Sequence, residues 1–295
     1  MIVDKTPRIR HSFRTAWHAL SALFLWDIAV TIFYFLSPFR APALPLTLFG
    51  TALALFLGFR VNSAYQRWWE ARILWGSMIN ASRSFTRGVL AFLPKREDTR
   101  TLRDDLVLRH IAYVQALRCQ LRRQDPLSEI RRLLGDRVEP AILDFQNPAN
   151  GLLHGSSVTI AEAQDNGLID TIQQTQIERV MVDIANAQGG MERIKNTPLP
   201  AQYRSFPSFF TRLFCILLPI GLVETLEIAT PFGSAVAGFM YLAVLQIGDD
   251  LVDPFANTAH DVPLTAMCRT IEIDLLQIIG RPTPPKLEPE NGILW

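Results

Sequence analysis

Residues 41–59 read APALPLTLFGTALALFLGF, a run of 19 positions without a charged side chain. The hydrocarbon core of a bilayer is about 30 Å thick, and an α-helix crosses it in about 20 residues. A second uncharged run covers the 21 residues 228–248. Both lengths predict helices that span a membrane.

The composition of the whole chain agrees with a membrane protein. Hydrophobic residues make up 49% of the 295 positions, charged residues make up 19%, and the mean hydropathy is +0.16. Soluble domains carry about 25% charged residues. The formal net charge of +1 gives no positive field that would favour nucleic acid as a partner. The three cysteines, Cys119, Cys215 and Cys268, lie too far apart for a disulfide framework or a zinc motif.

Two further apolar segments are interrupted by polar or ionisable residues. Residues 16–39 contain His18 and Asp27. Residues 213–223 are only 11 uncharged residues between Arg212 and Glu224, extended by residues 206–211. An ionisable side chain at membrane depth costs about 2.5–3.5 kcal/mol, so such helices usually face protein or water. We therefore expect a bundle of four transmembrane helices.

Basic residues predict the orientation of this bundle. They cluster before the first segment, after the second and at the start of the third, and such ends face the cytoplasm. Both termini are then cytoplasmic. The residues are Lys5, Arg8, Arg10, Arg14, Arg60, Arg67, Arg72, Arg204 and Arg212.

The polar stretch between the second and third spans shows helical periodicity in residues 65–93, 102–123 and 168–195, and no extended strand pattern. We expect an all-α protein in five parts. These are a cytoplasmic N-terminal segment (1–15), two spans (16–65, with a pore-lining second helix at 41–65), a cytoplasmic helical domain (66–205), two spans (206–250) and a cytoplasmic C-terminal segment (251–295).

One face of the second span could line a narrow path. Thr51, Leu55 and Phe59 recur every four residues and therefore share a helical face. Rings of leucine and phenylalanine around a symmetry axis form a hydrophobic constriction that gates by dewetting. Ordinary helix packing is the alternative, and periodicity alone favours it.

The residues that follow this span carry a family resemblance. Residues 56–72 read FLGFRVNSAYQRWWEAR, which resembles the signature of the bestrophin family, a Leu-Gly-Phe turn leading into Arg-Trp-Trp. Residues 253–255 read DPF, where the family has an Asn/Asp-Pro-Phe step. The segments NTPLP at 196–200 and IEIDLL at 271–276 are similar to those of its prokaryotic branch. The order and spacing of these motifs extend the resemblance over nearly the whole chain.

The resemblance implies a passive ion channel in a bacterial inner (cell) membrane, assembled from four further identical subunits as a homopentamer without a cofactor. The family's hydrophobic neck maps onto Thr51, Leu55 and Phe59, and its cytoplasmic aperture maps onto Ile172. Thr51 departs from the family pattern, which places an apolar side chain there. Five hydroxyl groups predict a wetter outer end of the neck.

The resemblance also raises the question of calcium binding, because calcium gates eukaryotic bestrophins through a clasp of carboxylates and carbonyls. The corresponding run here, residues 256–261, reads ANTAHD and holds one carboxylate. Calcium takes six to eight oxygen ligands. Asp250, Asp253 and Asp261 supply an incomplete, vestigial set, and helix capping with intersubunit hydrogen bonding is the alternative role for Asp253 and Asp261.

The sign of the conducted ion stays open between chloride, as in eukaryotic members, and monovalent cations, as in prokaryotic relatives. Glu224 and Glu227 fall on the expected outer connection with no basic residue nearby. Five copies would place ten carboxylates near the mouth, which concentrates cations. We expect a slight preference for cations, with an anion channel gated like the eukaryotic proteins as the alternative.

Residues 249–253, DDLVD, suggest an alternative function, that of an enzyme. They form a DDxxD sequence, which binds magnesium and a diphosphate in isoprenoid-processing enzymes. That chemistry needs a second facing carboxylate cluster. The only other adjacent aspartates are Asp104 and Asp105, which stand alone within a basic stretch and do not form such a cluster. The sequence therefore predicts a protein that is not an enzyme.

Overall fold

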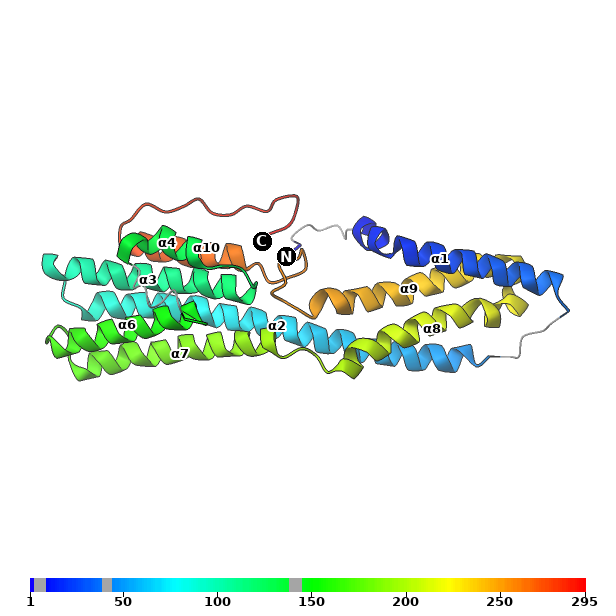
Figure 1. Ribbon diagram of the computed structural model, residues 1–295, viewed down its shortest axis with the longest axis horizontal. Helices are drawn as coiled ribbons and strands as arrows, with labels where there is room; N and C mark the ends of the chain where they lie inside the picture. Colours follow the sequence, from blue (N-terminus) through cyan, green and yellow to red (C-terminus); the bar gives the residue numbers. More distant parts are fainter. Residues whose placement is uncertain (3–8, 39–43, 138–144) are drawn as a thin grey trace. The chain divides into compact units, whose positions relative to one another are not determined.

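The computed structural model describes residues 1–2, 9–38, 44–137 and 145–295, and within these ranges the regular structure is helical (Figure 1). The sole β-pairing in the described ranges consists of isolated bridges from Ile293 to Ile2 and to Glu290. The chain divides into two compact units. We call residues 4–68 and 198–252 the apolar unit, and residues 1–3, 69–197 and 253–295 the polar unit.

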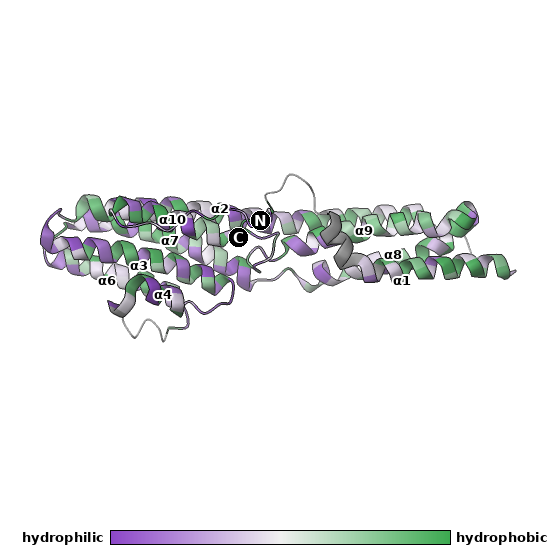
Figure 2. Cartoon of the chain, turned by 90° about the horizontal axis from the view of Figure 1, so that it is seen from above, coloured by the Kyte–Doolittle hydropathy of each residue, from purple (hydrophilic) through white to green (hydrophobic). Residues whose placement is uncertain are grey.

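The apolar unit is a bundle of α1 (Ile9–Leu36), the first part of α2 (Leu46–Phe92), α8 (Ala201–Leu226) and α9 (Thr230–Leu251). A 3₁₀ turn, η2 (Glu227–Ala229), joins α8 to α9, and α1, α8 and α9 pack against one another. Figure 2 shows these helices dominated by hydrophobic residues. In the described ranges, Leu46–Phe92 and Ala201–Leu251 are long and apolar enough to cross a membrane, and Leu20–Leu36 is a shorter apolar helix.

α2 is one continuous helix of 47 residues, where the sequence indicates a span and a separate helix at residues 65–93. It begins directly after Pro45, which lacks the N–H that a helix interior needs, and it ends two residues before Pro94. No proline lies between these two positions, so nothing in the sequence stops the helix where the charged residues begin. The division between the two units falls at Trp68 and Trp69, within α2.

The polar unit is built around α3 (Glu97–Leu121), which packs against several partner helices. Residues 106–108 and 110–117 of α3 are almost entirely buried, because other helices surround α3. The partners are α4 (Leu127–Leu134), α6 (Pro148–Asp165), α7 (Thr171–Asn196) and α10 (Leu264–Ile278), and the 3₁₀ turn η1 (Gly135–Arg137) follows α4.

The segment NPANG at residues 147–151 begins α6 rather than only separating two helices. The Asn147 side chain accepts a hydrogen bond from the Asn150 amide at 3.0 Å, which is an N-cap, and Pro148 occupies the first helical position. The helical periodicity of the sequence did not indicate α6, because turn-forming residues and helix-starting residues overlap in type.

The proline-rich tail, residues 281–295, packs irregularly against the polar unit. The Ala266 amide donates to the Trp295 carbonyl at 2.7 Å, and the Met1 amine donates to the Leu294 carbonyl at 2.6 Å. The first and last described residues therefore lie side by side. All three cysteines are free and buried, in agreement with their spacing.

Candidate pore-lining site

The first part of α2 has a buried face and an uncovered face, and both are apolar. Leu53 and Leu57 are buried against Phe214 and Leu218 of α8 and against Leu245 of α9. On the other face, Leu55 and Phe59 are each 60% exposed. Large apolar side chains that stay uncovered by their own chain, on a helix whose opposite face is packed, need either lipid or another protein surface.

Thr51 lies on the uncovered face, one turn before Leu55, and its hydroxyl is engaged. The hydroxyl donates a hydrogen bond to the Thr47 carbonyl of its own helix at 2.8 Å. Its proton is therefore unavailable to an ion or water, although its lone pairs can still accept.

Three polar contacts hold this part of α2 against α9 and its C-cap residue, one before Leu55 and two after it. Before it, the Tyr241 hydroxyl donates to the Gly50 carbonyl at 3.1 Å, and a Cβ at Gly50 would lie 3.1 Å from that hydroxyl. After it, the guanidinium of Arg60 pairs with Asp249, and the Arg67 Nε donates to the Val252 carbonyl at 3.0 Å. These contacts fix the rotation of α2 and thereby which of its faces stays uncovered.

The Arg60–Asp249 pair is unequal in its surroundings. Arg60 is 1% exposed, whereas the side chain of Asp249 is 49% exposed. The Nε and Nη1 atoms of Arg60 are buried without a hydrogen-bond partner among the described residues. The sequence patterns did not predict this pair. The signal that could have indicated it is the position of Arg60 directly after the uncharged span.

Asp27 occupies the interior of the bundle, as its place in an apolar segment predicts. It is buried, and its Oδ1 accepts a hydrogen bond from the Ser234 hydroxyl of α9 at 3.0 Å. The neighbouring Trp26 indole donates to the Ile216 carbonyl of α8 at 3.0 Å. Two consecutive residues of α1 therefore make polar contacts to two different helices.

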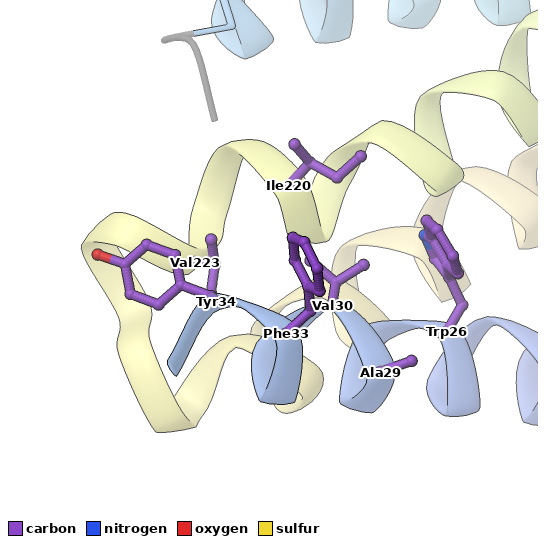
Figure 3. A pocket seen from close by; sticks show the side chains of 7 residues that line it. All are labelled: Trp26, Ala29, Val30, Phe33, Tyr34, Ile220 and Val223. Carbon is purple, nitrogen blue, oxygen red and sulfur yellow. The ribbon is translucent and has the colours of Figure 1, made fainter. Parts of the chain in front are cut away.

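Two cavities of the apolar unit have almost purely apolar walls. The first, between α1 and α8, has a volume of about 430 Å³, and Figure 3 shows Trp26, Phe33, Tyr34 and Ile220 among its lining side chains. The second, of about 340 Å³, lies between α2 and α8 and includes Phe56. An ion in either cavity would lose its hydration shell without polar groups to replace it. Neither cavity is a suitable ion path.

Ile172, the aperture candidate, lies in the first turn of α7 and is 72% exposed. The turn is well formed, because the Asp170 carboxylate accepts from the Gln173 amide at 2.7 Å and the Gln173 side chain accepts from the Asp170 amide at 3.0 Å. The neighbouring Ile169 is buried. The backbone turn that carries Ile172 is therefore well defined, and the Ile172 side chain is uncovered.

Glu224 and Glu227 are exposed at the end of α8. Glu227, the residue that ends α8, has a φ of 47° and a ψ of −121°, and its carbonyl accepts a hydrogen bond from the Thr230 hydroxyl at 2.7 Å. Neither carboxylate forms an ion pair with another residue in the described ranges.

The carboxylates considered for calcium each have a different partner. Asp250 accepts from the Gln246 side chain at 2.7 Å, and Asp253 accepts from the Lys195 ammonium at 2.8 Å. Asp261 accepts from the Thr258 hydroxyl at 2.6 Å and from its amide at 2.9 Å.

Burial raises the pKa of the Asp261 carboxyl above its ordinary value. The described residues contain no group of three or more His, Cys, Asp or Glu that could hold a metal ion. As placed, these carboxylates do not fit a calcium site, because Asp253 pairs with Lys195 and Asp261 accepts hydrogen bonds from Thr258 within its own loop.

The fold and this surface define a class: an all-α membrane protein whose long second helix presents an uncovered apolar face. Comparison with protein families narrows the class. The family described as Bacterial/Fungal Bestrophin protein matches residues 13–277. The chain belongs to the bestrophin family, as the signature at residues 56–72 predicts, and it is an ion channel.

Named relatives and solved structures agree with this assignment. The chain is 36% identical to the voltage-dependent anion channel-forming protein YneE of Salmonella typhi over 272 residues, covering 91% of this chain and 88% of the relative. The protein of the same name from Escherichia coli K12 is also 36% identical, over 84% of this chain and 80% of its own length.

A crystal structure of a bacterial bestrophin homolog from Klebsiella pneumoniae is 33% identical and superposes with a TM-score of 0.83, over 89% of this chain and 98% of that one. Because the family consists of channels, the alternative of a magnesium-dependent diphosphate enzyme falls away. Asp249, the first aspartate of the DDxxD sequence, pairs with Arg60.

Proposed function

We propose that five copies of this chain assemble around a central pore that conducts small monovalent ions passively, with Thr51, Leu55 and Phe59 lining its neck. The observation that carries the proposal is the 60% exposure of both Leu55 and Phe59 on a helix whose opposite face is packed. The apolar cavities within one bundle offer an ion no polar contact, which supports a path between copies.

A neck of this composition acts as a barrier through hydration. Five leucine and five phenylalanine side chains offer no oxygen to replace the water around an ion, so a narrow ring of them dewets and blocks conduction until it widens. The Thr51 ring adds only acceptor lone pairs, because its protons are bound by the Thr47 carbonyls. The contacts of α2 with α9 at Gly50 and Arg60 hold the neck side chains toward the pore.

The orientation follows from the basic residues. We place the channel in the bacterial inner membrane with both termini and the polar unit in the cytoplasm, because the arginines that follow the second span mark a cytoplasmic end. In this orientation the α8–α9 turn faces outward. Ile172, on the first turn of α7, forms a second apolar ring at the cytoplasmic aperture.

Exposed charge favours cations as the conducted ions. Glu224 and Glu227 are exposed at the α8–α9 turn, and ten such carboxylates around an outer mouth would concentrate cations. The second candidate is an anion channel, because the similar proteins from Salmonella typhi and Escherichia coli K12 are named voltage-dependent anion channel-forming proteins. The reversal potential of purified protein in a planar bilayer under a sodium chloride gradient distinguishes the two by its sign.

A charge-removal variant tests the role of the mouth in selectivity. If the glutamates set the preference, the double substitution Glu224→Gln and Glu227→Gln shifts the reversal potential toward that of an anion-selective pore. An unchanged reversal potential would remove these residues from the selectivity mechanism.

Single-channel recording tests the neck. Leu55→Ala and Phe59→Ala should raise conductance or open probability, because each removes five apolar side chains from the constriction. Phe56→Ala is the matched control, since Phe56 is 52% exposed on the same helix but lines the apolar cavity between α2 and α8. Equal effects of Phe56→Ala and Phe59→Ala, or a preparation that stays monomeric in mild detergent, would overturn the proposal.

A further inference from the structure

The polar unit contains a cavity of about 420 Å³ where α2 ends, α3 begins and α10 ends. Its walls combine four basic side chains, Lys95, Arg96, Arg100 and Arg103, with an apolar floor that includes Leu90 and Ile278. Figure 1 shows α2 passing into α3 through a short connection at one end of this unit. The volume falls within the range of about 300–1,000 Å³ that is usual for small-molecule sites.

The basic side chains converge because of their spacing along the chain. Arg96, Arg100 and Arg103 stand at positions i, i+4 and i+7, which places them on one face of the helix that Arg96 precedes as its N-cap. Lys95 stands one residue earlier, at the close of the α2–α3 connection. A single helical face therefore presents three guanidinium groups to the cavity.

The carboxylates around this cavity do not neutralise it. Asp104 also lines the cavity, but its Oδ2 accepts hydrogen bonds from Arg281 at 3.0 and 3.3 Å. Glu97 is exposed and lies 3.7 Å from Arg100, a distance and setting in which an ion pair contributes little. An excess of positive charge remains among the lining side chains.

Arg103, one of the arginines that line the cavity, is held in place by a hydrogen bond to α2. Its Nη2 donates to the Leu90 carbonyl at 3.2 Å, while its Nε is buried without a partner among the described residues. Guanidinium groups bind phosphate oxygens in bidentate fashion, which makes arginine the preferred residue for this anion.

We propose that this cavity binds a small molecule that carries a phosphate monoester on an apolar or aromatic body. The phosphate is held by Arg100, Arg103 and Lys95, and the apolar body packs on Leu90 and Ile278. A ligand so placed joins the end of α2, the start of α3 and the end of α10, and so it stabilises the polar unit. The proposal does not depend on the ion that the channel conducts.

Calorimetric titration of the full-length protein in detergent tests the proposal with four probes. Adenosine monophosphate carries both halves of the proposed ligand, inorganic phosphate and adenosine carry one each, and soluble short-chain phosphatidic acid carries the same phosphate on a lipid body. Saturable binding of the monophosphate, tighter than phosphate and adenosine, is the expected result. Tighter binding of phosphatidic acid supports the site with a lipid as its source. Absence of saturable binding by both monoesters overturns the proposal.

Variants locate the binding at this cavity. Arg100→Gln and Arg103→Gln should each weaken binding of the monophosphate by about tenfold to a hundredfold, the loss of one charge-assisted contact. Arg87→Gln is the matched control, because Arg87 is an exposed arginine of α2 whose guanidinium bonds Ser84 outside the cavity. Arg100 is exposed, so its substitution leaves folding intact, which the thermal unfolding midpoint without ligand verifies. Equal affinity in Arg87→Gln and Arg100→Gln would contradict the assignment.

Discussion

The unequal burial of Arg60 and Asp249 leads to an asymmetric prediction for the two halves of one ion pair. Asp249→Asn leaves the cation of Arg60 buried at 1% exposure without its counter-charge. Breaking a buried pair in this way costs about 3–5 kcal/mol. Because Asp249 is itself half-exposed and partly screened, we expect the lower end, about 3 kcal/mol.

The reverse substitution should be much milder. Arg60→Met replaces the buried guanidinium with an apolar side chain of similar length, and it leaves a carboxylate that is 49% exposed and can stay hydrated. Replacing a buried charge with a hydrophobic residue is often nearly neutral, so we expect a loss of about 1 kcal/mol or less. Removing the same residue type at an exposed pair, with Asp274→Asn opposite Arg83, should also cost less than about 1 kcal/mol.

Thermal unfolding in detergent, followed by intrinsic fluorescence, measures the difference. A loss of about 3 kcal/mol corresponds to a decrease of roughly 6–12 °C in the unfolding midpoint for a protein of this size, and about 1 kcal/mol to roughly 2–4 °C. From the highest unfolding midpoint to the lowest, the order should be wild type, Arg60→Met and Asp249→Asn. An Arg60→Met variant that unfolds at or below the midpoint of Asp249→Asn would refute the reasoning from burial.

Three further predictions concern protonation, the bundle interior and calcium. Burial lowers the pKa of His110 to about 3, so the unfolded state binds a proton that the folded state excludes, and stability falls by about 1.4 kcal/mol per pH unit below about pH 6.5. Unfolding midpoints at pH 5 and pH 7.5 should therefore differ less in His110→Leu than in the wild type; an equal difference would argue against His110. Asp27→Asn keeps an acceptor for the Ser234 hydroxyl and should lower stability by less than about 1.5 kcal/mol, whereas Asp27→Leu removes this hydrogen bond and should cost more in the same unfolding assay. Calcium should not raise the unfolding midpoint, because Asp253 and Asp261 are bound to Lys195 and Thr258; a calcium-dependent increase would show a site that these contacts do not predict.

The membrane-spanning helices could be read from the sequence because their lengths and composition are local properties. An uncharged run of 19 residues needs no distant partner to be recognised as a span, and proline positions explain where α2 begins and ends. The family likewise followed from the contiguous motif at residues 56–72. The apolar face with Leu55 and Phe59 was predicted from a four-residue period, and the structure leaves both side chains uncovered.

What the sequence could not determine depends on contacts between residues far apart in the chain. Arg60 and Asp249 are separated by 189 positions, and in sequence the aspartate belonged to an apparent DDxxD motif. The Ser234 partner of Asp27 is 207 positions away. Local patterns arise from hydrogen bonding within one helix, whereas the choice of partner for a buried charge follows from how the helices pack. The sequence by itself therefore determined the long apolar spans and the apolar face of the second one, whereas the tertiary structure alone showed that α2 is continuous, that α6 is a helix, and which contacts hold α2 in place.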